Sequence, residues 1–172
     1  MLLISIKMLS AQEPAIIPQP VSLKIESGVF VLDASTGIRA DIKQTGIAPV
    51  VVFLRASVKN ISGLSLQNKT TVKAIILQLG KFDEIGAEGY LMHVTTNSIS
   101  VQANTNAGLI YGIQTLLQTI PAIRTNAIMQ IPCMKIKDYP RFQYRGMHLD
   151  VSRHFLVLIL LSNTLIYWHP TK

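Results

Sequence analysis

A hairpin followed directly by a helix, near the middle of the chain, constrains the fold most. Residues 88–95 and 98–103 predict two β-strands around a turn at Thr96-Asn97, because apolar and polar residues alternate in the second arm. A helix over 107–120 is predicted next, because apolar residues recur at helical spacing and Pro121 follows them. Such a helix has to bury its apolar stripe against a neighbour, and the sheet is the nearest one.

Further strands and one more helix are predicted on both sides of this unit. Ser27-Gly28 predicts a turn between the first two strands, and residues 64–71 predict a polar connection. Apolar residues at helical spacing favour a helix over 46–63 that stops at Gly63, although the β-branched run 50–52 argues for a strand. The other strands are expected at residues 21–25, 29–32, 72–79 and 132–137.

Composition limits the classes of function. The hydrophobic fraction of 49% supports a buried core, and 172 residues suffice for one domain of ordinary size. The net charge is +7, but the 16 Lys and Arg are scattered singly, with no basic run and no interleaved aromatic residues. This pattern predicts a diffusely basic surface and no nucleic-acid binding.

The metal-binding and nucleophilic residue types are sparse. Cys133 is the single cysteine and lies in the apolar segment 131–134, which indicates a buried structural thiol. The four histidines lie far apart, and neither HExxH nor CxxC occurs. We therefore predict no metal site and no cofactor.

The segment 136–155, reading IKDYPRFQYRGMHLDVSRHF, carries residue types at a spacing that folding alone does not require. Asp138-Tyr139-Pro140 predicts a turn. The residues after it predict a strand covered on both faces, because apolar and polar side chains occur on each face. One face would carry Phe142, Tyr144, Gly146, His148 and Asp150, and the other Gln143, Arg145, Met147, Leu149 and Val151.

These residues carry a family resemblance. The segment PRFQYRGMHLDVSRHF at 140–155 resembles the start of the catalytic barrel of family 20 glycoside hydrolases, the β-N-acetylhexosaminidases. The resemblance includes IIPQP at 16–20, EGY at 88–90 and the helix at 107–120. It covers most of the chain from 16 to 155 and stops there.

The resemblance implies a fold and a division into domains. The expected class is an α/β (α+β) N-terminal domain, a sheet with helices on one face, followed by the first strand of an incomplete (β/α)8 barrel. The alternating strands and apolar helix stripes agree with a sheet covered on one face. We assign the non-catalytic N-terminal domain to residues 15–137 and the start of the catalytic barrel to 138–155.

The family hydrolyses terminal N-acetylglucosamine or N-acetylgalactosamine from glycans, with the substrate's own acetamido oxygen as nucleophile. An adjacent Asp-Glu pair late in the barrel orients the acetamido group and supplies the general acid and base. No such pair follows Phe155, and Asp83-Glu84 is interpreted as a solvated turn. Trp168 does not match the tryptophans of the family's sugar pocket. We therefore expect no catalytic residue here and no activity from this chain alone.

One site residue is implied by the resemblance. Arg145 matches the arginine that binds the C3 and C4 hydroxyls of the sugar, and a guanidinium fork suits a vicinal diol. Asp150, Arg153 and His154 belong to the same motif and are interpreted as residues that frame the barrel. The partner expected for the full-length parent is an N-acetylhexosamine-containing glycan.

The segment 155–168, FLVLILLSNTLIYW, departs from the family. A membrane span needs about 20 apolar residues, and this run is shorter and interrupted by Ser162-Asn163-Thr164. A back-translation of 155–172 with chosen synonymous codons, read two bases later, gives the helical pattern FSVDFIKQYIDLLASYK. We therefore interpret residues 156–172 as an aberrant, frameshifted tail and predict no membrane span.

Residues 1–11 are apolar and end in small side chains, which indicates either the remnant of a signal peptide or a frayed N-terminus. The resemblance favours export, so the parent is expected to be periplasmic or secreted. Two alternatives stay open: a free-standing carbohydrate-binding or interaction module, and a chain anchored by its tail. We also predict self-association through the orphan barrel strand after Arg141, whose backbone would be unpaired.

Overall fold

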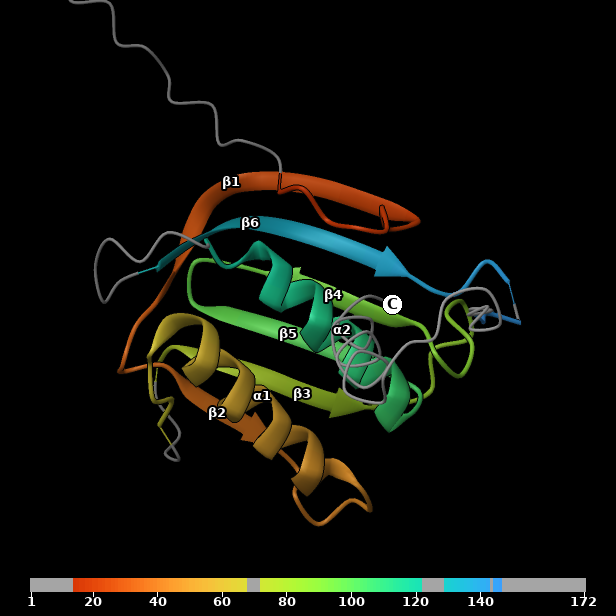
Figure 1. Cartoon of the computed structure of the whole chain (residues 1–172), viewed down its shortest axis with the longest axis horizontal. Coiled ribbons are helices and arrows are strands. Elements are labelled where there is room, and N and C mark those ends of the chain that lie inside the picture. Colours follow the sequence, from red (N-terminus) through yellow and green to blue (C-terminus); the bar gives the residue numbers. More distant parts are fainter. Residues whose placement is uncertain (1–13, 68–71, 122–128, 143, 147–172) are drawn as a thin grey trace, which may run out of the picture.

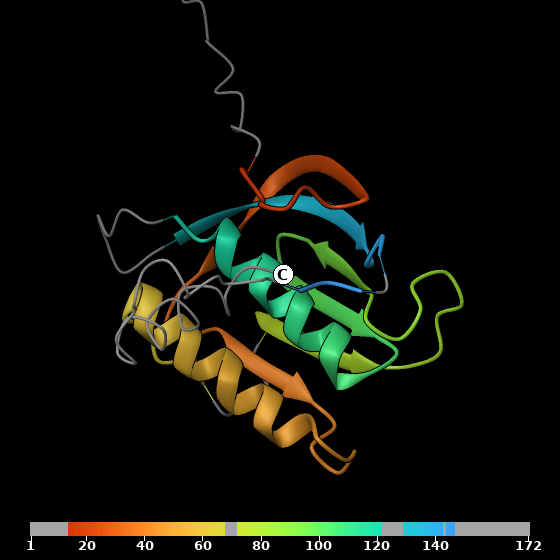
Figure 2. The ribbon, with the colours of Figure 1, turned by 45° about the vertical axis from the view of Figure 1, so that its right-hand side comes forward.

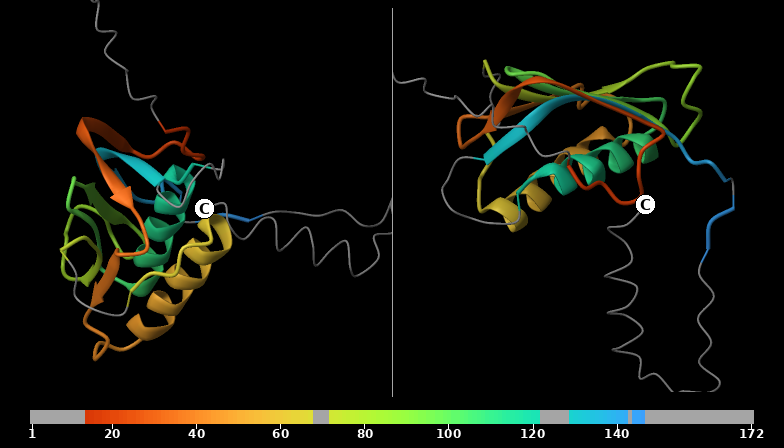
Figure 3. Two further views of the ribbon diagram at one scale, coloured as in Figure 1. Left: turned by 90° about the vertical axis from the view of Figure 1, so that its left-hand side faces the viewer. Right: turned by 90° about the horizontal axis from the view of Figure 1, so that it is seen from above.

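The computed structural model describes residues 14–67, 72–121, 129–142 and 144–146. These residues form one six-stranded mixed sheet with two helices on a single face (Figures 1 and 3). The strands are β1 (Ser22–Leu32), β2 (Gly37–Ala40), β3 (Ala74–Leu79), β4 (Tyr90–Val94), β5 (Ser98–Ala103) and β6 (Met129–Asp138), and the helices are α1 (Ile47–Ser62) and α2 (Asn106–Thr119). The predicted α+β architecture, with helices on one face, is confirmed.

The strands lie in the order β1-β6-β4-β5-β3-β2. The pairs β1/β6, β6/β4 and β4/β5 are antiparallel, whereas β5/β3 and β3/β2 are parallel. Helix α1 connects the parallel neighbours β2 and β3, which need a crossover of this kind. Helix α2 connects β5 to β6, which lie on either side of β4 in the sheet. The helices pack beside each other on the sheet (Figure 2).

The predicted hairpin and helix are confirmed. Strands β4 and β5 pair around Thr96-Asn97, and their alternate side chains are buried. Thr105 caps α2 by accepting a hydrogen bond from the Gly108 N–H, which satisfies one of the donors left free at a helix start. The predicted stripe faces the core: Leu109, Ile113, Leu116 and Ile120 are buried, and Leu117 is partly so.

The helix predicted over 46–63 is also confirmed. Gly63 adopts a left-handed conformation with φ of 76°, and its N–H binds the carbonyl of Lys59. This is the usual helix ending that glycine permits. The β-branched run at 50–52 is tolerated because Val50 is buried against the sheet, and tertiary packing outweighs a weak propensity.

The prediction of two strands separated by a turn at Ser27-Gly28 was wrong. β1 is one continuous strand, and its register with β6 shifts between Ile25 and Val29. Glu26, Ser27 and Gly28 lie opposite the single residue Cys133, which is a β-bulge, and Gly28 has a φ of 103°. A bulge and a turn use the same residue types, so composition alone does not separate them.

Two further differences concern edges and connections. The four-residue strand β2 was not predicted; it forms the sheet edge beside β3. The connection predicted as polar over 64–71 contributes apolar side chains, because Leu64 and Leu66 are buried in the core. Its residues 68–71 lie outside the described part of the chain.

Strand β6 begins at Met129, earlier than the predicted start at Pro132. Proline has no backbone N–H to donate, so a strand that has a neighbour on each side rarely contains one. It is tolerated because β6 pairs with β4 only from Met134 onward, while Pro132 faces β1 beside the bulge. Cys133 is buried at 2% exposure, as predicted, and burial raises the pKa of its thiol.

The predicted barrel strand lies mostly beyond the described residues. β6 ends at Asp138, and Arg145 and Gly146 are not in a strand. Residues 147–151, the tail and residues 1–11 are outside the described part. In the parts of the chain that are described, no helix is both long and apolar enough to cross a membrane.

Candidate functional site

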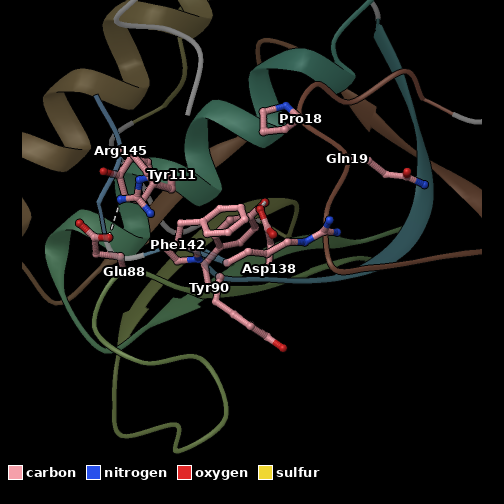
Figure 4. A pocket seen from close by; sticks show the side chains of 11 residues that line it. Pro18, Gln19, Glu88, Tyr90, Tyr111, Asp138, Phe142 and Arg145 are labelled. Atoms are coloured by element: carbon pink, nitrogen blue, oxygen red, sulfur yellow. Dashed lines mark hydrogen bonds and ion pairs between the residues drawn. The ribbon is translucent and has the colours of Figure 1, made fainter. Parts of the chain in front are cut away.

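A cleft of about 330 Å³ lies where the chain leaves β6, between that strand, α2 and the segment before β1 (Figure 4). We call it the boundary cleft, because it adjoins the end of the predicted N-terminal domain. Its volume is at the lower limit of small-ligand sites. It is lined by Pro18, Gln19, Glu88, Tyr90, Tyr111, Asp138, Tyr139, Pro140, Arg141, Phe142 and Arg145.

Arg145 is held in this cleft by two residues of the sheet-and-helix unit. Its Nη2 donates a hydrogen bond of 2.6 Å to Oε2 of Glu88, and its Cζ lies 6.0 Å from the centre of the Tyr111 ring (Figure 4). The hydrogen bond to Glu88 raises the pKa of the Arg145 guanidinium above its ordinary value. Both side chains are partly exposed, so the pair contributes about 1 kcal/mol or less.

The position of Glu88 is fixed by the turn in front of β4. The Asn104 side chain accepts a hydrogen bond from the Phe82 N–H at 2.7 Å and donates to the Phe82 and Gly86 carbonyls at 2.9 and 2.7 Å. The Thr105 hydroxyl donates to the Ala87 carbonyl at 2.6 Å. The residues that start α2 therefore also brace the turn that presents Glu88.

A buried hydroxyl forms the floor of the cleft. The Tyr90 hydroxyl shares a 2.6 Å hydrogen bond with Oγ1 of Thr115 and lies 3.2 Å from Oδ2 of Asp138. The other carboxylate oxygen of Asp138 accepts the Val21 N–H at 3.2 Å. Burial, with the negative Asp138 nearby, raises the pKa of Tyr90 far above its ordinary value. Tyr90 is therefore a neutral donor that connects β4 to α2 and β6, and Asp138 extends the network to the residue before β1.

The structure locates some of the predicted site residues. Arg145 lies in the boundary cleft, whereas Asp150, Arg153 and His154 lie outside the described residues. Asp83-Glu84 lies in an exposed turn, and Glu84 pairs with Lys137, which confirms its interpretation as a solvated turn.

Two residues of the cleft were not predicted as site residues. Glu88 and Tyr111 are separated from Arg145 by 57 and 34 positions in the sequence. The EGY segment that begins at Glu88 was noticed only for its resemblance. The residues next to Glu88 in the sequence do not indicate which cation its carboxylate binds.

In the described part of the chain, no group of three or more His, Cys, Asp and Glu side chains could hold a metal ion. What the cleft offers is a guanidinium between a carboxylate and an aromatic ring. Such a group presents paired N–H donors to oxygen atoms of a ligand.

A family model described as glycosyl hydrolase family 20, domain 2, matches residues 13–139. This chain belongs to glycosyl hydrolase family 20. The matched range contains all six strands and both helices and ends one residue after β6. The family 20 resemblance inferred from the sequence is thus confirmed.

Two relatives and one solved structure support the assignment of this chain to family 20. The chain is 30% identical to a beta-hexosaminidase of Porphyromonas gingivalis over 91% of its own length and 22% of that protein. It is 30% identical to a beta-N-acetylhexosaminidase of Cellulomonas fimi, covering 84% of this chain and 30% of that one. The structure of a Streptomyces plicatus N-acetyl-beta-hexosaminidase in complex with Thio-NAglucal superposes with a TM-score of 0.76 at 25% identity, over 90% of this chain and 32% of that chain. The chain thus spans about a fifth to a third of the length of these relatives.

Proposed function

We propose that residues 15–137 are the non-catalytic support of a β-N-acetylhexosaminidase and that 138–155 begin its catalytic barrel. The proposed parent releases terminal N-acetylglucosamine or N-acetylgalactosamine from glycans. The observation that carries the proposal is the position of Arg145, just past the range matched by the family model and held by Glu88 and Tyr111 of the matched range. The names of the relatives support the same substrate class.

Arg145 would bind the C3 and C4 hydroxyls of the terminal sugar. The bond to Glu88 uses one terminal nitrogen of a side chain that carries five N–H donors. A guanidinium held on one side by a carboxylate is oriented before a ligand arrives, which lowers the entropy lost on binding.

The chemistry would be substrate-assisted, with the acetamido oxygen of the sugar as nucleophile and an Asp-Glu pair as orienting group and acid-base catalyst. The 172-residue sequence contains one adjacent Asp-Glu pair, Asp83-Glu84, in an exposed turn far from Arg145 in sequence. We therefore expect the 172-residue chain to be inactive toward glycosides by itself.

The test starts from the DNA. The gene is read through codons 150 to 172 and several hundred bases beyond, and any frame that continues the barrel is expressed with the first 150 codons. That longer protein should hydrolyse an aryl N-acetylglucosaminide but not the matching aryl glucoside, which lacks the acetamido nucleophile. The 172-residue chain should hydrolyse neither. Equal turnover of both glycosides would contradict the mechanism, and turnover by the short chain would contradict its inactivity.

The role of Arg145 is tested in the same longer protein. Arg145→Lys keeps the charge but loses the planar fork. Since a charged hydrogen bond is worth about 1.5–3 kcal/mol, kcat/KM should fall about 10- to 100-fold. Arg39→Lys, on the sheet edge at β2, is the matched control and should leave kcat/KM unchanged. Equal values for both variants would remove Arg145 from the site.

The cleft itself favours a second candidate, a carbohydrate-binding module without catalysis. Aromatic rings of Tyr111 and Phe142 beside a guanidinium are a common way to hold a sugar ring, and Phe142 is exposed. Calorimetric titration of the 172-residue chain with N-acetylglucosamine distinguishes the two. Saturable binding that Arg145→Lys weakens would favour the module, and no heat at millimolar sugar would favour the enzyme fragment.

A further inference from the structure

The helices cover one face of the sheet and leave the other face open (Figure 3). On the open face, the strand registers place polar residues of neighbouring strands in a row. Strand pairing places Lys24 of β1 opposite Lys135 of β6, Lys135 opposite His93 of β4, and His93 opposite Ser100 of β5. A groove of about 380 Å³ is lined by these four residues and by the adjacent Lys137 and Gln102. We call it the open-face groove. Lysines that look scattered along the chain are gathered here because β1 and β6 are neighbours.

The charges on this row are not balanced. Lys24 and Lys135 are direct cross-strand partners, and like charges in that position destabilise a sheet. Glu26 offsets part of this, because its carboxylate binds Nζ of Lys135 at 2.8 Å and Nε2 of His93 at 3.1 Å. Among the described residues Lys24 forms no ion pair, and its side chain is exposed. An anion bridging the two ammonium groups would relieve the repulsion.

The chemistry beside the lysines indicates the kind of anion. The hydroxyl of Ser100 and the amide of Gln102 continue the groove, and both can bond to sugar hydroxyls. The imidazole of His93 lines the groove, but no Phe, Tyr or Trp side chain does, whereas surfaces for single-stranded nucleic acid combine a basic groove with several aromatic side chains on which bases stack. Four strands about 4.8 Å apart give the groove a length of about 14 Å, enough for a few sugar rings.

We propose that the open-face groove binds a sulfated glycan, with sulfate groups over Lys24 and Lys135 and hydroxyls against Ser100 and Gln102. A sulfate ester has three free oxygens and can accept from two neighbouring ammonium groups at once. The inference rests on the proposed action of the parent on glycans. It gives the support domain a second, non-catalytic contact with the substrate polymer, on the face that the helices leave uncovered.

The test measures binding by the full 172-residue chain. A fluorescein-labelled heparin hexasaccharide is titrated and followed by fluorescence polarisation in 50 and 200 mM NaCl. Saturable binding is expected, with affinity falling several-fold at the higher salt because exposed charges are screened. Chitohexaose, a hyaluronan hexasaccharide and single-stranded oligo-dT are added as competitors. None should compete at the concentration at which unlabelled heparin hexasaccharide does.

Variants locate the contact. Lys24→Gln should raise the Kd about threefold, the effect of one exposed ion pair, and Lys24→Gln with Lys135→Gln about tenfold. Lys59→Gln, on the exposed side of α1, is the matched control and should not change the Kd. Absence of binding, or equal Kd values for Lys24→Gln and Lys59→Gln, would overturn the proposal. Competition by oligo-dT would identify a nucleic-acid surface instead, and competition by hyaluronan a general carboxylate site.

Failure of this inference is separable from failure of the proposed function. Hydrolysis of the neutral aryl N-acetylglucosaminide by the longer protein does not depend on the open-face groove. If that hydrolysis occurs and heparin does not bind, only the groove proposal fails. If heparin binds through Lys24 and the longer protein hydrolyses nothing, the proposed function fails and the groove remains.

Discussion

Tyr90 is central to the structure of the boundary cleft, because its hydroxyl forms hydrogen bonds with both Thr115 and Asp138. Tyr90→Phe keeps the ring in the core but leaves the Thr115 hydroxyl and one oxygen of Asp138 without this contact. Loss of a buried hydrogen bond costs about 1–3 kcal/mol. We expect the free energy of unfolding, measured by urea titration, to fall by about 2 kcal/mol.

The control for Tyr90 is Tyr139→Phe. Its side chain is 37% exposed, and it makes no hydrogen bond that the structure records within the described residues, so the expected change is below about 0.5 kcal/mol. If the two substitutions cost the same, the hydroxyl network is not what holds the end of β6 against α2.

The family resemblance and the residue types together predicted part of the candidate site. Arg145 was identified from its motif, and the exposed turn at Asp83-Glu84 was anticipated from its polarity. The contact with Glu88 could not be foreseen, because it joins positions 57 apart and forms only when a turn braced by Asn104 lies beside the chain leaving β6. The role of Arg145 in sugar binding stays a prediction.

At the scale of elements, α2 approaches the sheet closely at its first turn. A Cβ on Gly108 would lie 2.3 Å from the Gly89 carbonyl oxygen and 2.9 Å from the Ala103 Cβ. Alanine favours helices by about 1 kcal/mol over glycine, but overpacking against backbone typically costs about 1–3 kcal/mol or more. Because the 2.3 Å approach is to a backbone oxygen, we expect the upper end of this cost, and Gly108→Ala should lower the free energy of unfolding by about 2 kcal/mol.

Ala56→Gly, on the exposed side of α1, measures helix propensity without the close approach and should cost about 1 kcal/mol. Urea titrations of both variants make the comparison. A Gly108→Ala chain as stable as the wild type, or more stable, would show that α2 can move away from the turn before β4.

Elements with a clear period were predicted correctly, and elements defined by their neighbours were not. The hairpin, α1 and α2 each carry enough alternating or helical positions to be predicted locally, and β3 carries a short continuous apolar run. The four residues of β2 are too few for a period, and they form a strand only because β3 lies beside them. The bulge at Gly28 depends on β6, a strand more than 100 residues away in sequence.

For the whole molecule, ion pairs on the sheet make stability depend on pH. Hydrogen bonds from Lys135 and then His93 hold the pKa of Glu26 below its ordinary value of 4.5. A hydrogen bond from the Ser35 hydroxyl, with Lys73 nearby, lowers the pKa of Asp33 below 3.8. A carboxyl whose pKa is lower in the folded state stabilises the fold above its unfolded pKa, and this contribution is lost as the pH falls through the folded value.

We therefore expect the urea midpoint to be constant from about pH 7 to 5 and to fall from about pH 5 to 3. Glu26→Gln and Asp33→Asn should each flatten the fall, because the substituted group no longer titrates. Asp83→Asn, in the exposed turn before β4, is the control and should leave the slope unchanged. A midpoint independent of pH down to 3 would contradict the role given to these pairs.

The strand order has a consequence for the way this protein is made. β1 has a single neighbour in the sheet, β6, which is the last of the described strands in the chain. During synthesis β1 leaves the ribosome long before β6, its single partner among the described strands, and the full β1/β6 pairing cannot form until Lys137 has emerged. A chain in that interval contains the residues of β2 to β5 and of both helices, but it lacks the strand that covers the edge of β4 in the finished sheet. A chain released before β6 is complete would expose that edge to other copies, which is where aggregation or capture by a chaperone would begin.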